Sequence, residues 1–315
     1  MNKIIQSVYS SYTKISNVGK VLLWICVFFI IVQLFKPSTS FLSSSKEGFQ
    51  QQESFVFLQD NDKIYDNFYA NIYDSLVYSS TKDDYELGEW KKNTKPSSRS
   101  IILDVGCGNG HHVSKLSEMG FNAIIGIDKS QAMVKKAKEK YPGLDFRQED
   151  VMKSIIFQPE TFTHILCLYF TIYYVSNKQS FFDNCFHWLK RGGYLAVHLV
   201  DRDNFDPILN PANPLIFVSA QKYAKKRITS SKVVFEGFDY KADFDFDHPE
   251  IVKFKESFTE KGTNRVRKQE HSLYMEDLEH ILHIAQECGF IVIGKIDLIK
   301  VQYEYQYLYI FQKPE

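Results

Sequence analysis

The sequence predicts an α/β fold in which a seven-stranded sheet ends in an antiparallel strand and a small antiparallel β cap follows the fifth strand. Three observations lead to this prediction. Apolar runs alternate with helical patterns between residues 101 and 200, as in a sheet covered by helices. A glycine-rich turn at 103–110 joins the first apolar run to a helix. Two apolar runs at 290–298 and 305–311 close the chain as a hairpin.

The composition limits the class of protein. The chain has 315 residues, enough for one large or two small domains, and 44% of them are hydrophobic. Its formal net charge is zero, which excludes nucleic-acid binding driven by bulk charge. The five cysteines are scattered, odd in number and without C-x-x-C spacing. This pattern argues against a disulfide framework and a zinc site, and no metal is expected.

An almost unbroken apolar run covers residues 21–35, between Lys20 and Lys36. A bilayer core of about 30 Å takes about 20 helical residues, and flanking lysines can snorkel to lengthen a short span. We therefore expect a membrane anchor at about 20–36, within an N-terminal segment 1–36. A cleaved signal peptide and a helix buried in a soluble protein are the alternatives.

Two observations bear on the orientation of this anchor, and they favour opposite orientations. Lys3, Lys14 and Lys20 precede the run, which favours a cytoplasmic N-terminus and a translocated domain. The scattered cysteines are typical of a reducing compartment, which favours a domain in the cytosol. We expect a single-pass membrane protein whose folded domain faces the cytosol.

Residues 37–60 are rich in Ser and Gln and predict a flexible tether. The folded domain then spans 61–315. Its first expected element is a helix at 64–76, where aromatic or apolar residues recur at helical spacing. The polar stretch 91–100 predicts a loop that leads into the first strand.

Residues 103–110 read Leu-Asp-Val-Gly-Cys-Gly-Asn-Gly, and a helical pattern follows them. Glycine accepts positive φ and lets backbone approach a ligand, while a helix N-terminus offers free N–H groups. A dinucleotide fingerprint would need a further glycine where this chain has His111. Asp104 would also place negative charge beside a pyrophosphate. The loop therefore favours a cofactor that carries a cationic amino-acid end.

This loop resembles motif I of the class I S-adenosylmethionine (SAM)-dependent methyltransferases, D-x-G-x-G-x-G. The resemblance implies a Rossmann-like fold over about 64–314 and SAM as the cofactor. It implies that the helix at 64–76 lids the cofactor, although a plain amphipathic helix has the same pattern. It assigns these loop residues to cofactor binding: Asp104, Gly106, Cys107, Gly108 and Gly110.

The second and third predicted strands, 121–127 and 144–151, end in residues that the resemblance places at the cofactor. Asp128 is placed to accept hydrogen bonds from both ribose hydroxyls, as it would be for a nicotinamide cofactor too. Met133 is implied to pack against the adenine, and the third strand's exit to meet its amino group. The cofactor residues implied here are Asp128, Lys129, Met133, Asp150 and Val151.

The fourth predicted strand, 162–169, leads to Phe170-Thr-Ile-Tyr-Tyr174, where the family places motif IV beside the transferring methyl. The resemblance assigns Leu168 and Tyr169 to the cofactor pocket, and tyrosine rings can face a sulfonium. A helix at 180–190 is expected to stop at Arg191-Gly192-Gly193, and the fifth strand to cover 194–200.

Residues 201–274 form a long insertion, to which the resemblance assigns substrate selectivity. Alternation predicts strands with one buried face at 233–246, 252–258 and 265–274. The insertion carries both signs of charge: Asp239, Asp243, Asp245, Asp247, Lys253, Lys255, Arg265 and Arg267. This mixture favours a small polar acceptor, an amine or an acid, over a nucleic acid. The anchor keeps a lipid or a protein open as acceptor.

The end of the chain supports the SAM interpretation independently. A helix at 275–288 leads to the closing hairpin, whose last strand is expected to run antiparallel to the others. Such a strand is typical of the methyltransferase sheet, whereas a nicotinamide-binding fold continues in parallel.

The implied reaction is in-line displacement of the SAM methyl group by a nucleophilic atom. Holding the two reactants in line supplies most of the catalysis, so no base is strictly required. Candidates for a base are Tyr173, His198, Asp201 and His271. Two alternatives are an NAD(P)-dependent oxidoreductase and a membrane-tethered SAM-binding module without turnover. The sequence predicts no oligomeric state.

Overall fold

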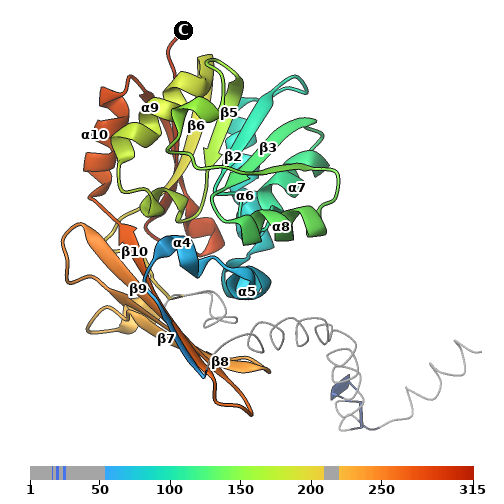
Figure 1. Cartoon of the computed structure of the whole chain (residues 1–315), viewed down its shortest axis with the longest axis vertical. Coiled ribbons are helices and arrows are strands. Elements are labelled where there is room, and N and C mark those ends of the chain that lie inside the picture. Colours follow the sequence, from blue (N-terminus) through green and yellow to red (C-terminus); the bar gives the residue numbers. More distant parts are fainter. Residues whose placement is uncertain (1–15, 17–18, 21–23, 26–53, 209–219) are drawn as a thin grey trace, which may run out of the picture. The chain divides into compact units, whose positions relative to one another are not determined.

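The computed structural model describes residues 54–208 and 220–315, together with Ser16, Gly19, Lys20, Trp24 and Ile25 (Figure 1). The chain divides into two compact units, Met1–Ser43 and Ser44–Glu315. Within the part of the chain that is described, no helix is long and apolar enough to cross a bilayer. Most of the predicted anchor at 20–36 and of the predicted tether at 37–60 lies outside the described residues.

The larger sheet has seven strands, as predicted. They are β2 (Ile101–Val105), β3 (Ala123–Asp128), β4 (Asp145–Gln148), β5 (Phe162–Cys167), β6 (Leu189–Val200), β11 (Ile291–Asp297) and β12 (Gln306–Gln312). Their order is β11-β12-β6-β5-β2-β3-β4. The strands from β6 to β4 are parallel, whereas β12 pairs antiparallel with both β6 and β11. The predicted antiparallel last strand is therefore confirmed.

Helices cover both faces of this sheet (Figure 1). One face carries α6 (Ser80–Thr94), α7 (His111–Glu118) and α8 (Gln131–Lys140), and the other carries α9 (Lys178–Trp188) and α10 (Leu278–Glu287). Central parallel strands between two helical layers are buried on both faces, and Leu103, Ile165 and Val197 are accordingly inaccessible to solvent. Short 3₁₀ helices lie at Ser154–Ile156 (η1), Thr171–Tyr174 (η2), Ala220–Tyr223 (η4) and Leu298–Val301 (η5).

Two predicted boundaries around the sheet are wrong. The helix α9 ends at Trp188 and β6 begins at Leu189, so Gly192 and Gly193 lie inside the strand instead of stopping the helix. They coincide with an irregular register between β5 and β6. A Cβ on Gly193 would lie 2.8 Å from the Lys190 carbonyl oxygen, so the bend needs glycine there. The predicted loop at 91–100 starts only after Thr94, where α6 ends.

The cap is a separate five-stranded sheet. Its strands are β1 (Phe55–Leu58), β7 (Ser230–Val234), β8 (Phe238–Asp245), β9 (Ile251–Glu260) and β10 (Val266–Tyr274), in the order β1-β10-β9-β8-β7. The single strand predicted at 233–246 is two strands, interrupted at residues 235–237. The predicted tether is wrong for residues 55–58, because β1 pairs in parallel with β10.

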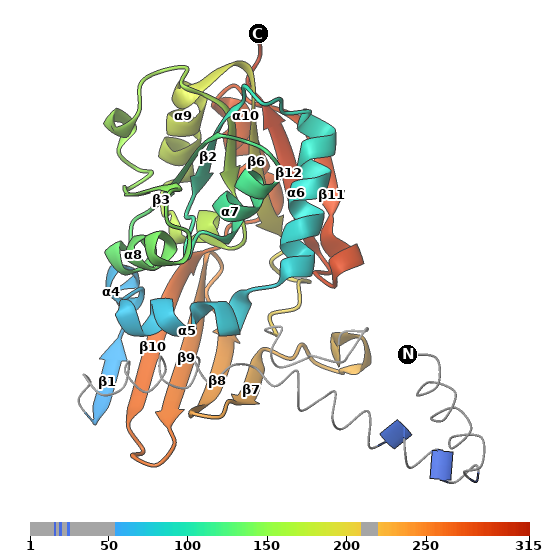
Figure 2. The same ribbon diagram turned by 90° about the vertical axis from the view of Figure 1, so that its right-hand side faces the viewer.

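Two helices connect the cap to the larger sheet, namely α4 (Asn61–Ile64) and α5 (Asn67–Val77) (Figure 2). The helix predicted at 64–76 starts at Asn67, since the Asp66 side chain accepts a hydrogen bond from the Tyr69 N–H as its N-cap. Asn61 accepts from the backbone N–H of Ser272 and donates to its carbonyl oxygen. This pair of hydrogen bonds holds α4 against β10.

Candidate functional site

The glycine loop turns tightly between β2 and α7. Gly106, Gly108 and Gly110 have φ values of 69°, 53° and 86°, a region that side chains disfavour. A Cβ on Gly106 would lie 2.4 Å from Cγ2 of Thr171, and one on Gly110 would lie 2.6 Å from the Phe146 ring. Positions 106 and 110 therefore have no room for a larger residue.

Asp128 closes this loop from the end of β3. Its Oδ2 accepts a hydrogen bond of 3.0 Å from the Gly108 N–H, and its Oδ1 accepts one of 2.8 Å from the Ser130 N–H. Burial raises the pKa of this carboxyl, while the two N–H donors oppose the rise. Each carboxylate oxygen can accept a further hydrogen bond. Asp128 is therefore oriented to receive hydroxyl groups of a ligand in the adjoining cavity.

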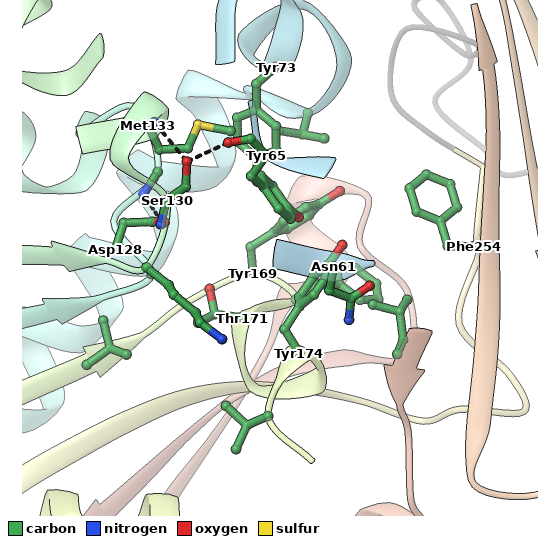
Figure 3. A pocket seen from close by; sticks show the side chains of 18 of the residues that line it. Asn61, Tyr65, Tyr73, Asp128, Ser130, Met133, Tyr169, Thr171, Tyr174 and Phe254 are labelled. Carbon is green, nitrogen blue, oxygen red and sulfur yellow. Dashed lines mark hydrogen bonds between the residues drawn. The ribbon is translucent and has the colours of Figure 1, made fainter. Parts of the chain in front are cut away.

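A cavity of about 500 Å³ opens beside the loop and extends to the cap. Its size is within the range of about 300–1,000 Å³ that ligand pockets occupy. The predicted cofactor residues that line it are Gly106, Gly108, Asp128, Lys129, Met133, Asp150, Val151 and Tyr169. The predicted residues outside its lining are Asp104, Cys107, Gly110 and Leu168. In Figure 3 the labelled tyrosines lie between Asp128 and Met133 on one side and Phe254 on the other.

An aromatic wall from the α4–α5 segment forms one side of the cavity. Tyr69 and Tyr73 are four residues apart on α5 and share a helical face, and Tyr65 directly follows α4. All three line the cavity. The helical aromatic spacing predicted this helix, but the individual rings were not singled out. The predicted role as a lid is consistent with this position, because the face that α5 turns to the cavity covers the glycine loop.

Two polar contacts fasten α5 to the glycine loop. The Asn109 amide donates to the Ala70 carbonyl oxygen at 2.9 Å and to Asp74 Oδ1 at 3.0 Å. His111 also lies 3.0 Å from Asp74, and Lys140 lies 2.5 Å from it. Although burial alone would raise it, the contacts with His111 and Lys140 hold the pKa of Asp74 well below its usual range. His111, where a dinucleotide site would need glycine, thus attaches the loop to α5.

The comparisons with known proteins agree with this geometry. Residues 102–193, which hold the loop and Asp128, match the family model of a methyltransferase domain. The similarity of this chain to trans-aconitate 2-methyltransferase from Acidovorax sp. (strain JS42) is 31% identity over 107 residues, covering 34% of this chain and 40% of that protein. This chain thus matches less than half the length of its curated relatives.

Solved structures of methyltransferases share the fold of the domain. An S-adenosylmethionine-dependent methyltransferase from Clostridium acetobutylicum superposes with a TM-score of 0.61 at 18% identity, covering 79% of this chain and 99% of that one. A SAM-bound amino pentose methyltransferase from Micromonospora echinaspora superposes with a TM-score of 0.55 at 16% identity, covering 75% and 92%. These similarities confirm the predicted Rossmann-like α/β fold.

Behind the glycine loop, Asp104 belongs to a buried charged cluster. Asp83, Glu86 and His112 have ligand atoms within 4.8 Å of one another, and His112 Nδ1 lies 4.0 Å from Asp104. Lys82 Nζ lies 2.5 Å from Glu86, which offsets part of the negative charge. Burial raises the pKa of Asp104 to about 6, with His112 opposing. Burial likewise raises the pKa of the Cys107 thiol, as expected for a small side chain that packs inside the loop.

All four predicted catalytic candidates lie outside the lining of the cavity. Tyr173 is buried, and its hydroxyl accepts a hydrogen bond from the Val200 N–H at 2.8 Å instead of facing an acceptor. His198 is buried against the rings of Tyr169 and Phe170, outside the cavity lining. The Asp201 carboxylate accepts hydrogen bonds from the backbone N–H of Asp203 and from the side-chain amide of Asn204, both in its own loop. None of these three side chains is placed to contact an acceptor directly.

The fourth candidate, His271, lies one side chain away from the cavity. Its ring is fully buried and its Nδ1 lies 2.9 Å from Oη of Tyr174, which does line the cavity. From the sequence, both tyrosines were placed in motif IV, and Tyr173 was predicted as a candidate base in place of Tyr174. The two neighbours differ because one side of η2 faces the core and the other faces the cavity.

The cap lines its end of the cavity with Phe244, Phe254 and Leu273. These residues belong to the buried face of the alternating strands. Of the charged residues in the insertion, Arg267 is only 1% exposed and donates to Asp66 at 2.7 Å. Asp245 and Lys255 instead pair with each other at 2.7 Å on the outer face. The charged side chains of the cap strands are therefore absent from the lining of the cavity, and the part that these strands contribute is apolar.

Proposed function

We propose that this chain transfers a methyl group from SAM to a small-molecule acceptor. The observation that carries the proposal is the placement of Gly106, Gly108 and Asp128 on one cavity, inside the segment that matches a methyltransferase domain. The relatives support it, because the names of the curated and solved proteins describe methyl transfer with SAM.

The lining residues fit SAM. Asp128 would bind the ribose hydroxyls, and Met133, Asp150 and Val151 would surround the adenine. A Cβ on Gly108 would meet only Tyr73, at 3.7 Å, so the loop backbone is open to the amino-acid part of the ligand. The faces of aromatic rings attract a cation, which suits a sulfonium beside Tyr73 or Tyr169. When bound, SAM supplies an electrophilic methyl group.

A small-molecule acceptor suits the cap end of the cavity. Aromatic and apolar side chains bound it there, and such walls bury most of a small ligand. The named substrates of two relatives, trans-aconitate and an amino pentose, belong to this size class. The protein's main contribution would then be to hold acceptor and methyl in line. A lipid or a protein as acceptor would require the cap to open.

Calorimetry on the full chain tests the cofactor. We expect SAM to bind and NADH to give no heat of binding, because His111 occupies the position of the third dinucleotide glycine. Incubation with methyl-labelled SAM and a pool of small metabolites then tests turnover. Binding of NADH without SAM would favour the oxidoreductase, and SAM binding without transfer to any metabolite would favour a binding module without turnover.

We propose further that residues 20–36 anchor the chain in a membrane, with the methyltransferase domain in the cytosol. The apolar run between Lys20 and Lys36 supports this. The full chain should remain in the membrane pellet after carbonate washing, and Phe29→Lys should release it. A mature chain that starts after residue 36 would show a cleaved signal peptide instead. Digestion of the domain by protease added outside intact cells would reverse the proposed orientation.

A further inference from the structure

A chain of hydrogen-bonding side chains runs from the cavity into the cap sheet. Tyr174 lines the cavity, and its Oη lies 2.9 Å from Nδ1 of His271 on β10. Nε2 of His271 lies 2.7 Å from Oε2 of Glu256 on β9. His271 and Glu256 are 0% and 3% exposed. One imidazole thus connects a hydroxyl at the cavity to a carboxylate that solvent does not reach.

The partners of Glu256 determine which nitrogen of His271 carries the proton. The carboxylate also accepts from Tyr240 Oη at 2.6 Å and from the Gln269 amide at 2.5 Å. Burial raises its pKa, but the hydrogen bonds from His271, Tyr240 and Gln269 bring the pKa below its ordinary value. A carboxylate only accepts, so the proton of a neutral His271 is on Nε2. Nδ1 then keeps a lone pair, to which the Tyr174 hydroxyl donates.

A structural role alone does not account for this network. The rest of the inner face of the cap sheet is mostly apolar, with Phe244, Phe254 and Phe258 among its buried side chains. Buried polar groups are commonly no more stabilising than well-packed apolar side chains in their place. The network also ends at the cavity, in the segment where methyl transfer is expected. Its polar groups therefore suit a task at the cavity.

We propose that Tyr174, His271 and Glu256 form a proton relay for methyl transfer, so that the acceptor atom is a hydroxyl oxygen or an amine nitrogen that arrives carrying a proton. The relay rests on the proposed methyltransferase function. A carboxylate acceptor carries no proton at neutral pH and would not use it. Tyr174 is the catalytic residue, because it alone of the three lines the cavity. His271 and Glu256 are positioning residues that act through it.

The proton and electron balance of the step is as follows. The acceptor atom gives its proton to the Tyr174 oxygen, while the Tyr174 hydroxyl proton moves to Nδ1 of His271. The electron pair of the acceptor atom forms the bond to the methyl carbon, and the pair of the broken S–C bond stays on sulfur. The positive charge of the sulfonium is thereby replaced by that of the His271 imidazolium, beside the Glu256 carboxylate.

The groups around the relay determine the protonation state in which Tyr174 acts. The titratable and charged groups that face it are Tyr65, Tyr69, Tyr73, Tyr169, Tyr240 and, through Gln269, Arg267. Burial raises the pKa of Tyr174 and of each of these tyrosines above its ordinary value. None of these tyrosines changes charge near neutral pH. Tyr174 is therefore a protonated phenol at rest, and it transfers its proton to His271 during the reaction.

Nitrogen-15 NMR of the full chain with labelled histidine tests the relay without any acceptor. The signals of His271 are identified by their loss in His271→Gln. We expect a pyrrole-type shift for Nε2 and a pyridine-type shift for Nδ1, with Nδ1 shifting in Tyr174→Phe. A proton resident on Nδ1 at pH 7–8, in the other tautomer or in an imidazolium, would overturn the relay, because Tyr174 could not then pass its proton on.

Turnover with labelled SAM tests it a second way, with catechol, glucosamine and trans-aconitate as probes. We expect methyl groups on the hydroxyl or amine probe and none on trans-aconitate. Tyr174→Phe should lower kcat roughly 10²–10⁴-fold, the usual contribution of general acid–base catalysis. Glu256→Gln should lower kcat less, and His271→Gln should remove the pH dependence of kcat/KM. The control is Tyr173→Phe, which removes a neighbouring buried hydroxyl outside the cavity and should keep the wild-type pH profile.

Failure of the relay and failure of the methyltransferase function are distinguishable. A wild-type chain that binds no SAM would overturn both. A chain that binds SAM and methylates a probe, but loses less than about threefold in kcat with Tyr174→Phe, would overturn the relay alone. Transfer to trans-aconitate alone would overturn the acceptor class. If no probe accepts a methyl group, the histidine spectrum decides the relay.

Discussion

At the scale of single residues, Gly106 decides how closely η2 can approach the loop. Its φ of 69° and the Thr171 side chain, which would lie 2.4 Å from an added Cβ, both require glycine. Gly120 has a φ of 93°, but an added Cβ there would meet nothing within 4 Å. The two glycines thus share a left-handed backbone conformation, but only at Gly106 would an added Cβ collide with a neighbouring side chain.

We expect Gly106→Ala to weaken SAM binding by tenfold or more, about 1.4 kcal/mol, because Thr171 must move into the cavity. Gly120→Ala should leave SAM binding unchanged, although each change costs roughly 1–2 kcal/mol of stability through its left-handed backbone. Calorimetry of SAM binding measures the difference. Adding Thr171→Ala to Gly106→Ala should restore part of the affinity, since only a Cβ contact at 3.1 Å remains. Equal affinity of the two glycine variants would contradict the steric argument.

The candidate site could be predicted from the sequence where a local motif carries it, and not where it depends on register between strands. Asp128 and Met133 follow from their distance to the glycine loop. Tyr174 and Tyr173 are neighbours of one type, and only the packing of η2 shows which one reaches the cavity. The partners of His271 stand on other strands of the cap, and no local pattern places Glu256 beside it.

At the scale of elements, the cap sheet is joined to the α4–α5 segment by Arg267. Its guanidinium donates to Asp66 at 2.7 Å, to the Ile64 carbonyl oxygen at 3.1 Å and to Gln269 at 2.9 Å. It also lies over the Phe68 ring. One side chain of β10 therefore holds the N-cap of α5, and α5 carries the aromatic wall of the cavity.

We expect Arg267→Met to lower the free energy of unfolding by about 2–3 kcal/mol. Removing one partner of a buried ion pair commonly costs about 3–5 kcal/mol, and the loss is smaller here because Asp66 is partly exposed. Urea unfolding of the full chain measures it. Lys268→Met on the same strand is the control, because Lys268 is exposed and should change stability by less than about 0.5 kcal/mol. Similar values for the two variants would mean that Arg267 does not join the cap to α5.

The helices and strands themselves were predictable where a hydrophobic pattern extends over many residues. Prediction failed where a strand pairs with a partner that is far away in the sequence. The strands of the larger sheet and the alternating strands of the cap appear near their predicted positions. The strand β1 was expected to be tether, because its four residues stand in a Ser- and Gln-rich stretch and their partners Val266–Gln269 are more than 200 residues away. The pair Gly192–Gly193 signals a bend, and a bend inside a strand has the same local sequence as a helix stop.

At the scale of the whole molecule, buried histidines predict how stability depends on pH. Burial lowers the pKa of His164 to about 4 and that of His198 to about 3. Burial would lower the pKa of His112 too, but Asp83, Asp104 and Glu86 raise it to about 9. His164 and His198 contribute stability that is present above pH 6.5 and lost as the pH falls towards 4. His112 contributes stability that is present below pH 6.5 and lost between 6.5 and 9.

We therefore expect maximal stability near pH 6.5, with a loss on either side. The alkaline loss amounts to at most about 3 kcal/mol by pH 9, from the shift of the His112 pKa. On the acid side Asp104 acts in the opposite direction, because its raised pKa of about 6 lets the folded state hold a proton that the unfolded state has lost. Two histidines outweigh this one carboxyl. Urea unfolding of the full chain at pH 5, 6.5 and 8.5 measures the loss of stability on the acid side and on the alkaline side of this maximum, the acid limb and the alkaline limb of the curve.

His112→Gln should flatten the alkaline limb and leave the acid limb in place, since it removes only the group that loses its proton above pH 6.5. His283→Gln is the matched control, because His283 is 65% exposed on α10 and should change neither limb. An alkaline limb that persists in His112→Gln would show that another group carries it.

Because His112 lies directly behind Asp104, its deprotonation removes the cation that opposes the burial of that carboxyl. The loss of stability should therefore be accompanied by weaker SAM binding at pH 8.5 than at pH 6.5.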